Sequence, residues 1–399
     1  MDQQGISKLD LKRQNRMQIL KLLKQQGPTS RIDIAAILKL TRAAVTIIAN
    51  EMIEQGIIQE VGEQKTIGKK PSRGRKKILI DINHNYKFAL GALIDDEQVS
   101  IGLSTLDGSV LDKRNLSIDE NADYSTIFGF IVNSIKEIMS YNCLDTSNIL
   151  GLGVAILPET CHKLNMEIGS DGMMDFTSLK KSLSEHFKFS IVFTDAITAL
   201  GMANIDFASE KSKLPQDIAL VNYGKSLNCV LFSGNEPTHP GGGLTNQIES
   251  IRYDNKTLKE SMAPYAAFCK AKEAFSKART PELYTICEGD ASKLSHFTVE
   301  QAYRAGDETI VEIIDEACDN FLVLLNNILM IARPDSIFLQ ACELCSGLML
   351  ELVLKHAPTV LGEENAKLVS EGIIEIRQRF LGGCAVAIRT LFFTKGGYI

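Results

Sequence analysis

The chain has 399 residues, of which 45% are hydrophobic and 23% charged, and its mean hydropathy is near zero. This composition excludes a wholly disordered or collagen-like chain, and the length suits about two to three domains. No run reaches about 18 consecutive apolar residues, so a membrane span is not expected. The polar start, residues 1–5, leads into no apolar segment and is not expected to be a secretory signal. The nine cysteines are scattered through apolar surroundings, as in proteins of a reducing compartment, and predict a cytoplasmic protein.

The charge is divided unevenly along the chain. Residues 1–80 contain 16 Lys and Arg but 7 Asp and Glu, a balance of +9, whereas the remaining 319 residues carry −15. A small basic segment joined to a large acidic one indicates that the basic segment meets a polyanion.

The basic segment has the pattern of a helix-turn-helix. Apolar residues recur with helical spacing from Leu11 to Gln25, and Gly27-Pro28 ends that helix. Ser30 and Thr41 are candidate caps for a short helix over 32–38 and a third helix over 42–55, which Gly56 terminates. In such a unit the start of the last helix enters the major groove of double-stranded DNA. The predicted contacts there are Thr41, Arg42, Ala44 and Thr46, and Arg31 is included with them.

A basic hairpin is predicted to follow the three helices. Residues 57–61 and 77–81 alternate like strands, and Lys65 to Lys77 contains seven bases and no acid. Arg73-Gly74-Arg75, followed by Lys76, suits insertion into a narrow minor groove, because glycine admits the backbone and arginine favours the negative potential. The alternative is a solvated linker without groove specificity.

The rest of the chain predicts a two-lobed α/β body. Strands are expected over 88–93, 98–105 and 110–117, followed by a helix over 124–139 and strands over 149–157 and 190–194. The pattern then restarts with strands over 217–223 and 228–232, a largely helical region over 257–330, and a strand over 336–340. Helices over 345–356 and 382–393 close the chain. We therefore expect a winged helix-turn-helix domain over 1–81 and a body over 82–399. Its lobes cover roughly 82–200 plus the C-terminal helix, and 201–380.

The chain resembles transcriptional regulators of the ROK family (repressor, open reading frame, kinase), and is most similar to the glucose and N-acetylglucosamine repressors. In the winged helix-turn-helix domain, hereafter the head, the resemblance rests on residues 26–31, 54–60 and Arg73-Gly74-Arg75. In the body it rests on residues 151–158, 193–196 and 332–337. It implies an actin-like, sugar-kinase body, an operator as partner, a sugar or sugar-phosphate effector, and a homo-oligomer (a dimer or a dimer of dimers). A body that binds another protein is a further hypothesis.

Several family motifs are altered in this chain. The family kinases hold ATP phosphates with an Asp-x-Gly-Gly-Thr turn, where this chain has Asp95-Asp96-Glu97, and three acids would repel phosphate. ATP chemistry is therefore not expected, although a sugar kinase with a fused head remains the alternative. The family's zinc-binding histidine position is Ser250 and its cysteine loop is missing, so no metal or other cofactor is expected. Cys342 and Cys345 are interpreted as structural.

The resemblance places the effector contacts at Thr194, Asp195, Gln247 and Glu260. Carboxylates and amides accept or donate hydrogen bonds to sugar hydroxyls. For Asp195 the alternative is that it caps the helix that follows. The sequence contains no supported arrangement of nucleophile and base, so a regulator is predicted and an enzyme is not.

Overall fold

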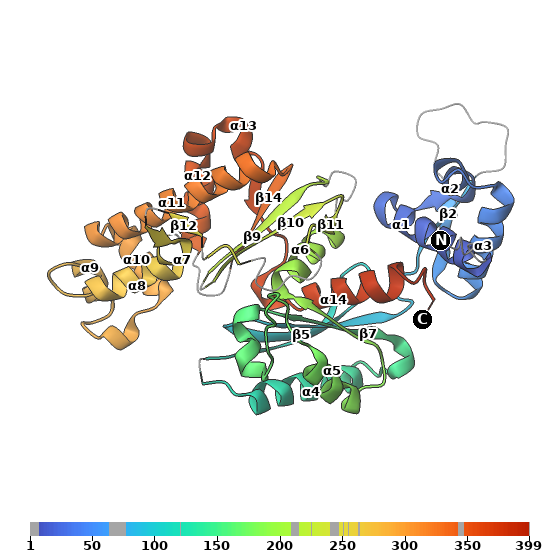
Figure 1. The fold of residues 1–399 in the computed structure, drawn as a ribbon, viewed down its shortest axis with the longest axis horizontal. Coiled ribbons are helices and arrows are strands. Elements are labelled where there is room, and N and C mark those ends of the chain that lie inside the picture. Colours follow the sequence, from blue (N-terminus) through green and yellow to red (C-terminus); the bar gives the residue numbers. More distant parts are fainter. Residues whose placement is uncertain are drawn as a thin grey trace.

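The structure is a computed structural model, which describes residues 8–63, 77–119, 121–208, 215–224, 226–239, 247–249, 251–253, 255–261, 264–341 and 347–398. The chain forms a small N-terminal head and a two-lobed body, with the head at one end of an elongated molecule (Figure 1). The C-terminal end of the described chain lies beside the head (Figure 1). Among the described residues, no helix combines the length and apolar character that crossing a membrane requires.

The head contains the predicted three helices and the two strands of the hairpin. They are α1 (Lys8–Gln26), α2 (Arg31–Ile37), α3 (Arg42–Glu54), β2 (Ile58–Glu63) and β3 (Ile78–Ile82). Both predicted caps are confirmed, because the Ser30 and Thr41 side chains accept hydrogen bonds from the backbone N–H groups of Asp33 and Ala44. The sequence did not predict that Thr29–Ser30 also forms a short strand, β1, which pairs with β3.

The first lobe is a mixed five-stranded sheet. Its strands are β4 (Phe88–Ile94), β5 (Gln98–Ser104), β6 (Val110–Ser117), β7 (Ile149–Ile156) and β8 (Ile191–Asp195), in the order β6-β5-β4-β7-β8. The helices α4 (Tyr124–Tyr141) and α5 (Thr177–His186) pack on one face, where Leu90 and Ile94 of β4 are buried. Ala89 and Leu93, which point to the other face, contact the core formed with α6 (Ala196–Asp206) and α14 (Leu381–Ala387). Short 3-10 helices are η1 (Thr146–Asn148) and η2 (Pro158–Leu164).

The second lobe repeats this arrangement, which confirms the predicted duplication. Its strands are β9 (Ile218–Tyr223), β10 (Leu227–Ser233), β11 (Glu236–Pro237), β14 (Ser336–Ala341) and β15 (Val369–Glu371), in the order β11-β10-β9-β14-β15. In both lobes an antiparallel pair adjoins parallel strands. A small hairpin and the helices of this lobe complete it: β12 (Arg252–Tyr253), β13 (Lys256–Thr257), α7 (Leu258–Ser261), α8 (Pro264–Ala274), α9 (Pro281–Ile286), η5 (Ala291–Lys293), α10 (His296–Ala305), α11 (Glu308–Ala332), α12 (Gly347–Leu361), α13 (Glu363–Ala366) and η6 (Ile376–Gln378).

The C-terminal helix α14 lies unusually close to the first sheet. A Cβ atom added to Gly153 of β7 would lie 1.9 Å from the carbonyl oxygen of Gly383 in α14. Gly91 of β4 meets the same helix, where an added Cβ would lie 2.1 Å from the Phe380 carbonyl oxygen. The chain then continues without a break through a π-helical turn, η7 (Ile388–Phe393), so the helix predicted over 382–393 is confirmed, with its second half π-helical.

Candidate nucleic-acid interface and interlobe site

The helix α3 presents a solvent-exposed surface at its N-terminal end. Its core face buries Val45, Ile48, Ala49 and Met52. Arg42 and Thr46 are exposed on the opposite face, and Thr46 donates its hydroxyl to the Arg42 carbonyl oxygen at 2.7 Å. Ala44, which the sequence analysis treated as exposed, is half-buried, and Ile47 is 65% exposed. Ile47 was not among the predicted contacts, although it follows Thr46 on the exposed side of α3.

The remaining predicted DNA contacts have different surroundings. The Arg31 guanidinium is paired with Glu60 at 2.9 Å and bonded to Asn50 at 3.3 Å, so a phosphate would have to compete with Glu60. Arg73, Arg75 and Lys76 lie outside the described residues. Lys77, at the base of the hairpin, is paired with Asp33 at 2.7 Å, which ties the hairpin to α2.

A buried ion pair fills the place where the resemblance locates the ATP phosphates. The Nη1 atom of Arg379 lies 2.5 Å from Oδ2 of Asp95, and its Nη2 lies 3.4 Å from Oδ1 of Asn222 in β9. Oδ1 of Asp95 accepts the backbone N–H groups of Glu97 and Gln98 at 3.0 and 2.8 Å. Arg379 and Asp95 are 3% and 2% exposed, and the adjacent free space is about 10 Å³, on the order of one water molecule.

Asp95 has a cationic partner. From the sequence, the turn was expected to present three acids that repel phosphate. Asp95 is instead neutralised by Arg379, which joins the first lobe to the second through Asn222. Phosphate binding is opposed here because the Arg379–Asp95 pair fills the site, in addition to the repulsion from the other acids of the turn.

The four predicted effector residues make contacts with different neighbours. Asp195 is buried at the end of β8, and its Oδ1 accepts the Thr198 N–H at 2.9 Å, so the alternative role as the cap of α6 is confirmed. Thr194 precedes it on the same strand and is half-buried. Gln247 forms a β-bridge with Asn228 of β10. Glu260 is exposed, and hydrogen bonds from the Thr257 N–H and hydroxyl hold its pKa below the usual range.

Glu159 is a residue of this region that the sequence analysis missed. It follows Pro158 directly after β7, and both its carboxylate oxygens are buried. The pKa of Glu159 is raised to about 7, chiefly by burial and also by the Glu249 and Asp96 carboxylates, while hydrogen bonds from its own backbone N–H and from Gln247 lower it. A carboxyl group with this pKa can both donate and accept hydrogen bonds at neutral pH. The sequence did contain an indication of this residue, because the Pro-Glu pair stands at the carboxyl end of a predicted strand, where ligands of α/β folds bind.

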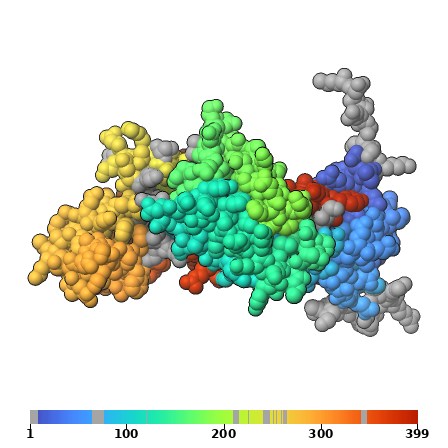
Figure 2. All heavy atoms as spheres, turned by 90° about the horizontal axis from the view of Figure 1, so that it is seen from below, coloured from blue at the N-terminus to red at the C-terminus, as the bar shows by residue number. Residues whose placement is uncertain are grey.

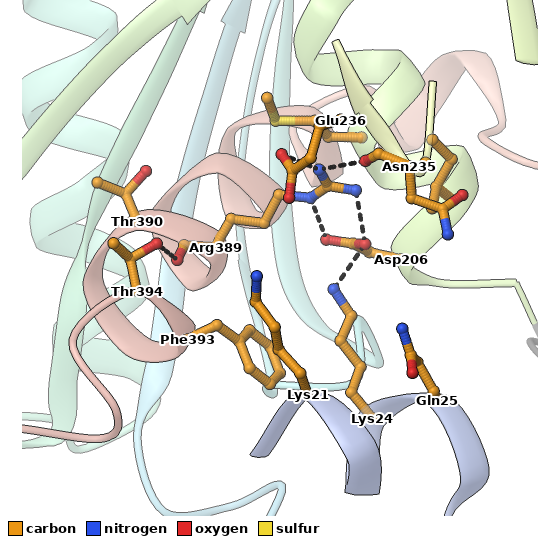
Figure 3. Close-up of a pocket in the computed structure, with 13 residues that line it drawn as sticks. Lys21, Lys24, Gln25, Asp206, Asn235, Glu236, Arg389, Thr390, Phe393 and Thr394 are labelled. Atoms are coloured by element: carbon orange, nitrogen blue, oxygen red, sulfur yellow. Dashed lines mark hydrogen bonds and ion pairs between the residues drawn. The ribbon is translucent and has the colours of Figure 1, made fainter. Parts of the chain in front are cut away.

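The head is joined to the body by buried charges. The carboxylate of Asp206, at the end of α6, is bound by Lys24 of α1 at 2.6 Å and by Nε and Nη2 of Arg389 at 2.8 and 2.9 Å (Figure 3). Burial alone would raise the pKa of Asp206, but Lys24 and Arg389 outweigh it and lower the pKa to about 2.

The C-terminal segment forms a second connection to the head. Arg16 of α1 is fully buried, donates from Nε to the Gly396 carbonyl oxygen at 2.8 Å, and lies 3.9 Å from the centre of the Tyr398 ring. Its Nη2 also donates to Gln55 at the end of α3, at 2.7 Å. Figure 2 shows the C-terminal segment, in red, against the blue head. The buried apolar residues of the head belong to one continuous cluster with those on the face of the first sheet that α6 and α14 cover.

Comparison with known proteins agrees with both parts of this architecture. A family model described as winged helix-turn-helix DNA-binding matches residues 12–59. The N-acetylglucosamine repressor of Escherichia coli O157:H7 is 27% identical over 405 residues, covering 96% of this chain and 97% of the repressor.

Two solved structures share the fold. A ROK family transcriptional regulator, a homologue of the E. coli Mlc protein, superposes with a TM-score of 0.69 at 16% identity and covers 97% of both chains. A ROK family glucokinase from Streptomyces griseus, in complex with glucose and AMPPNP, has a TM-score of 0.56 at 13% identity. It covers 75% of this chain and 98% of the kinase. The predicted winged head and sugar-kinase-like body are confirmed, and the resemblance to ROK regulators extends over nearly the whole chain.

Proposed function

We propose that this chain is a DNA-binding transcriptional regulator of the ROK type, a repressor of carbohydrate-related genes that acts in the cytoplasm. The observation that carries the proposal is the exposed N-terminal face of α3 in a winged helix-turn-helix, within a segment of charge +9. Residues 1–81 would bind an operator in double-stranded DNA, and residues 82–399 would sense an effector and join subunits.

The body is proposed to bind a sugar or sugar-phosphate effector near Asp195. Asp195 ends β8 and Glu159 follows the neighbouring parallel strand β7, at the edge where ligands of such folds bind. Thr194, Gln247 and Glu260 are the other proposed contacts. A relative that covers nearly this whole chain is named for N-acetylglucosamine, which supports a carbohydrate effector. A body that binds a protein partner is the alternative.

Subunit pairing is part of the proposal, because one winged helix makes a small interface with DNA. Single modules bury about 600–1,000 Å² of protein surface, less than most specific complexes. A homodimer, or a dimer of dimers, would place two heads on a roughly two-fold operator.

The DNA-binding proposal is tested by comparing α3 with the basic hairpin. Arg42→Ala should weaken binding to an operator selected from a random library by about 1–3 kcal/mol and relax its sequence preference. Arg73→Ala with Arg75→Ala should instead reduce the salt dependence and lower the preference for A·T-rich flanks. The measurement is a set of salt-titrated binding curves on operators with A·T-rich and G·C-rich flanks.

Lys136→Ala, an exposed cation on α4, is the matched control and should leave the curves unchanged. If Arg73→Ala with Arg75→Ala loses the same affinity on both kinds of operator, the hairpin contributes only attraction to phosphates. No loss on either would contradict the groove assignment, and an unaffected Arg42→Ala would contradict the placement of α3 in the major groove.

We further propose that the chain does not transfer phosphate from ATP to hexoses, although it shares its fold with a glucokinase. The buried pair of Arg379 with Asp95 occupies the phosphate position, which supports this. A coupled assay with ATP and glucose should show no turnover above a protein-free blank. Turnover that disappears in Asp195→Asn would overturn the prediction.

A further inference from the structure

A cavity of about 290 Å³ lies where the head meets the body (Figure 3). Helix α1 supplies Lys21, Lys24 and Gln25, and the other walls come from the end of α6, the turn between β10 and β11, and η7. This volume is just below the usual range for small-ligand pockets, which begins at about 300 Å³. The cavity is separate from Asp195, because α6 places its 11 residues, about 16 Å of helix, between Asp195 and Asp206.

The charges around the cavity do not balance. Lys21, Lys24 and Arg389 converge on it, and Figure 3 shows both lysine side chains extending from α1 toward Arg389. The single negative charge of Asp206 is shared by two cations, since Lys24 binds one of its oxygens and Arg389 binds both. The other acid, Glu236, is 68% exposed and lies 3.4 Å from Arg389 at the rim, where water screens it.

Lys21, which like Glu236 is exposed, supplies the unbalanced charge. Across the described parts of the chain, no carboxylate forms an ion pair with its ammonium group, whereas Lys24, three residues later on the same helix face, is paired with Asp206. Two neutral side chains that can donate hydrogen bonds also line the cavity: the exposed Thr390 hydroxyl and the Gln25 amide. The Phe393 ring, 4.7 Å from the Lys24 ammonium, gives the cavity an apolar wall.

We propose that this cavity is a second ligand site, which binds a small phosphate monoester or phosphate itself between Lys21 and Thr390. A dianion would meet the Lys21 ammonium and the hydroxyl and amide donors, with Lys24 and Arg389 adjacent. The apolar wall would contact the carbon skeleton of an organic phosphate. A neutral sugar would leave the Lys21 charge without a partner.

Occupancy of this site would hold the head against the body. Lys21 belongs to the head and Thr390 to the C-terminal segment, so a bound anion links two parts that meet there. A ligand that binds the docked arrangement favours it by mass action. This inference concerns binding in the absence of DNA, so its failure would leave the DNA-binding proposal untouched.

The test is calorimetric titration of the full-length chain with inorganic phosphate, glucose 6-phosphate and glucose. We expect at least one of the two phosphates to bind, and Lys21→Gln to raise its Kd at least tenfold. The affinity should also fall with added salt. Lys136→Gln, on the exposed side of α4, is the matched control and should leave the Kd within twofold.

Thr390→Val provides a second variant and should weaken the same ligand severalfold, since it removes a hydroxyl donor. Binding of inorganic phosphate alone would support the site and identify free phosphate as its ligand, and tighter binding of glucose 6-phosphate would identify an organic phosphate. Binding of either that is unchanged in Lys21→Gln would place the anion elsewhere and overturn the proposal. The absence of binding by both phosphates would also overturn it.

Discussion

Replacing Arg379 with methionine should lower the free energy of unfolding by about 3–5 kcal/mol, because the Asp95 carboxylate would remain buried without its cation. Asp95 is 2% exposed, and its Oδ2 lies 2.5 Å from the Arg379 guanidinium. Methionine keeps most of the side-chain volume, so the loss of stability comes from removing the charge and not from opening a cavity. Urea unfolding of the wild-type and variant chains measures it.

The double variant Arg379→Met with Asp95→Asn is the control for this result. It removes both charges of the pair, and the asparagine oxygen can still accept the Glu97 and Gln98 N–H groups. It should therefore recover much of the stability lost in Arg379→Met, and the double-mutant cycle gives the coupling between the two side chains. If Arg379→Met lowers the free energy of unfolding by less than about 1 kcal/mol, the pair is solvated like a surface ion pair, which would contradict its buried geometry.

Gly153→Ala should lower the free energy of unfolding by about 3 kcal/mol, the upper end of the cost of overpacking a core. The added methyl group would lie 1.9 Å from the Gly383 carbonyl oxygen, and that backbone atom cannot rotate away as a side chain would. Thermal and urea unfolding measure the change.

Gly129→Ala is the matched control, since it makes the same chemical change within α4. No neighbouring atom lies within 4 Å of its added Cβ. Alanine favours a helix over glycine, so this variant should gain about 0.5–1 kcal/mol. Similar losses at both positions would contradict the close contact between α14 and β7.

The head could be predicted in detail because its signals are local. Ser30 and Thr41 mark helix starts within a few residues of the apolar pattern that they precede, and Gly56 marks an end. The two lobes were predictable for a similar reason, since each strand carries its own apolar run and the order of elements repeats. The short strand β1 was missed because two residues carry no periodicity, and its pairing with β3 is a tertiary contact.

The contacts that build the sites could not be predicted, because they join distant residues. Arg379 and Asp95 are 284 positions apart, and Arg16 and Gly396 are 380 apart. No local pattern indicates that such residues meet, and a charged side chain is normally expected at the surface. The same reason hid the role of Asp206, which as the last residue of a helix has an ordinary position in the sequence.

The glycine contact between α14 and the first sheet determines which parts of the molecule can move against one another. Backbone packed on backbone leaves no side chains that could slide, so the first lobe and α14 form one solid piece. The same chain continues through η7 to the segment that holds Arg16 and the head. A head fixed on an operator would therefore hold the first lobe stationary. Any rotation of the second lobe relative to the first would then leave the head in place. If subunits pair through the second lobe, such a rotation would change the spacing between two heads without changing the structure of either head.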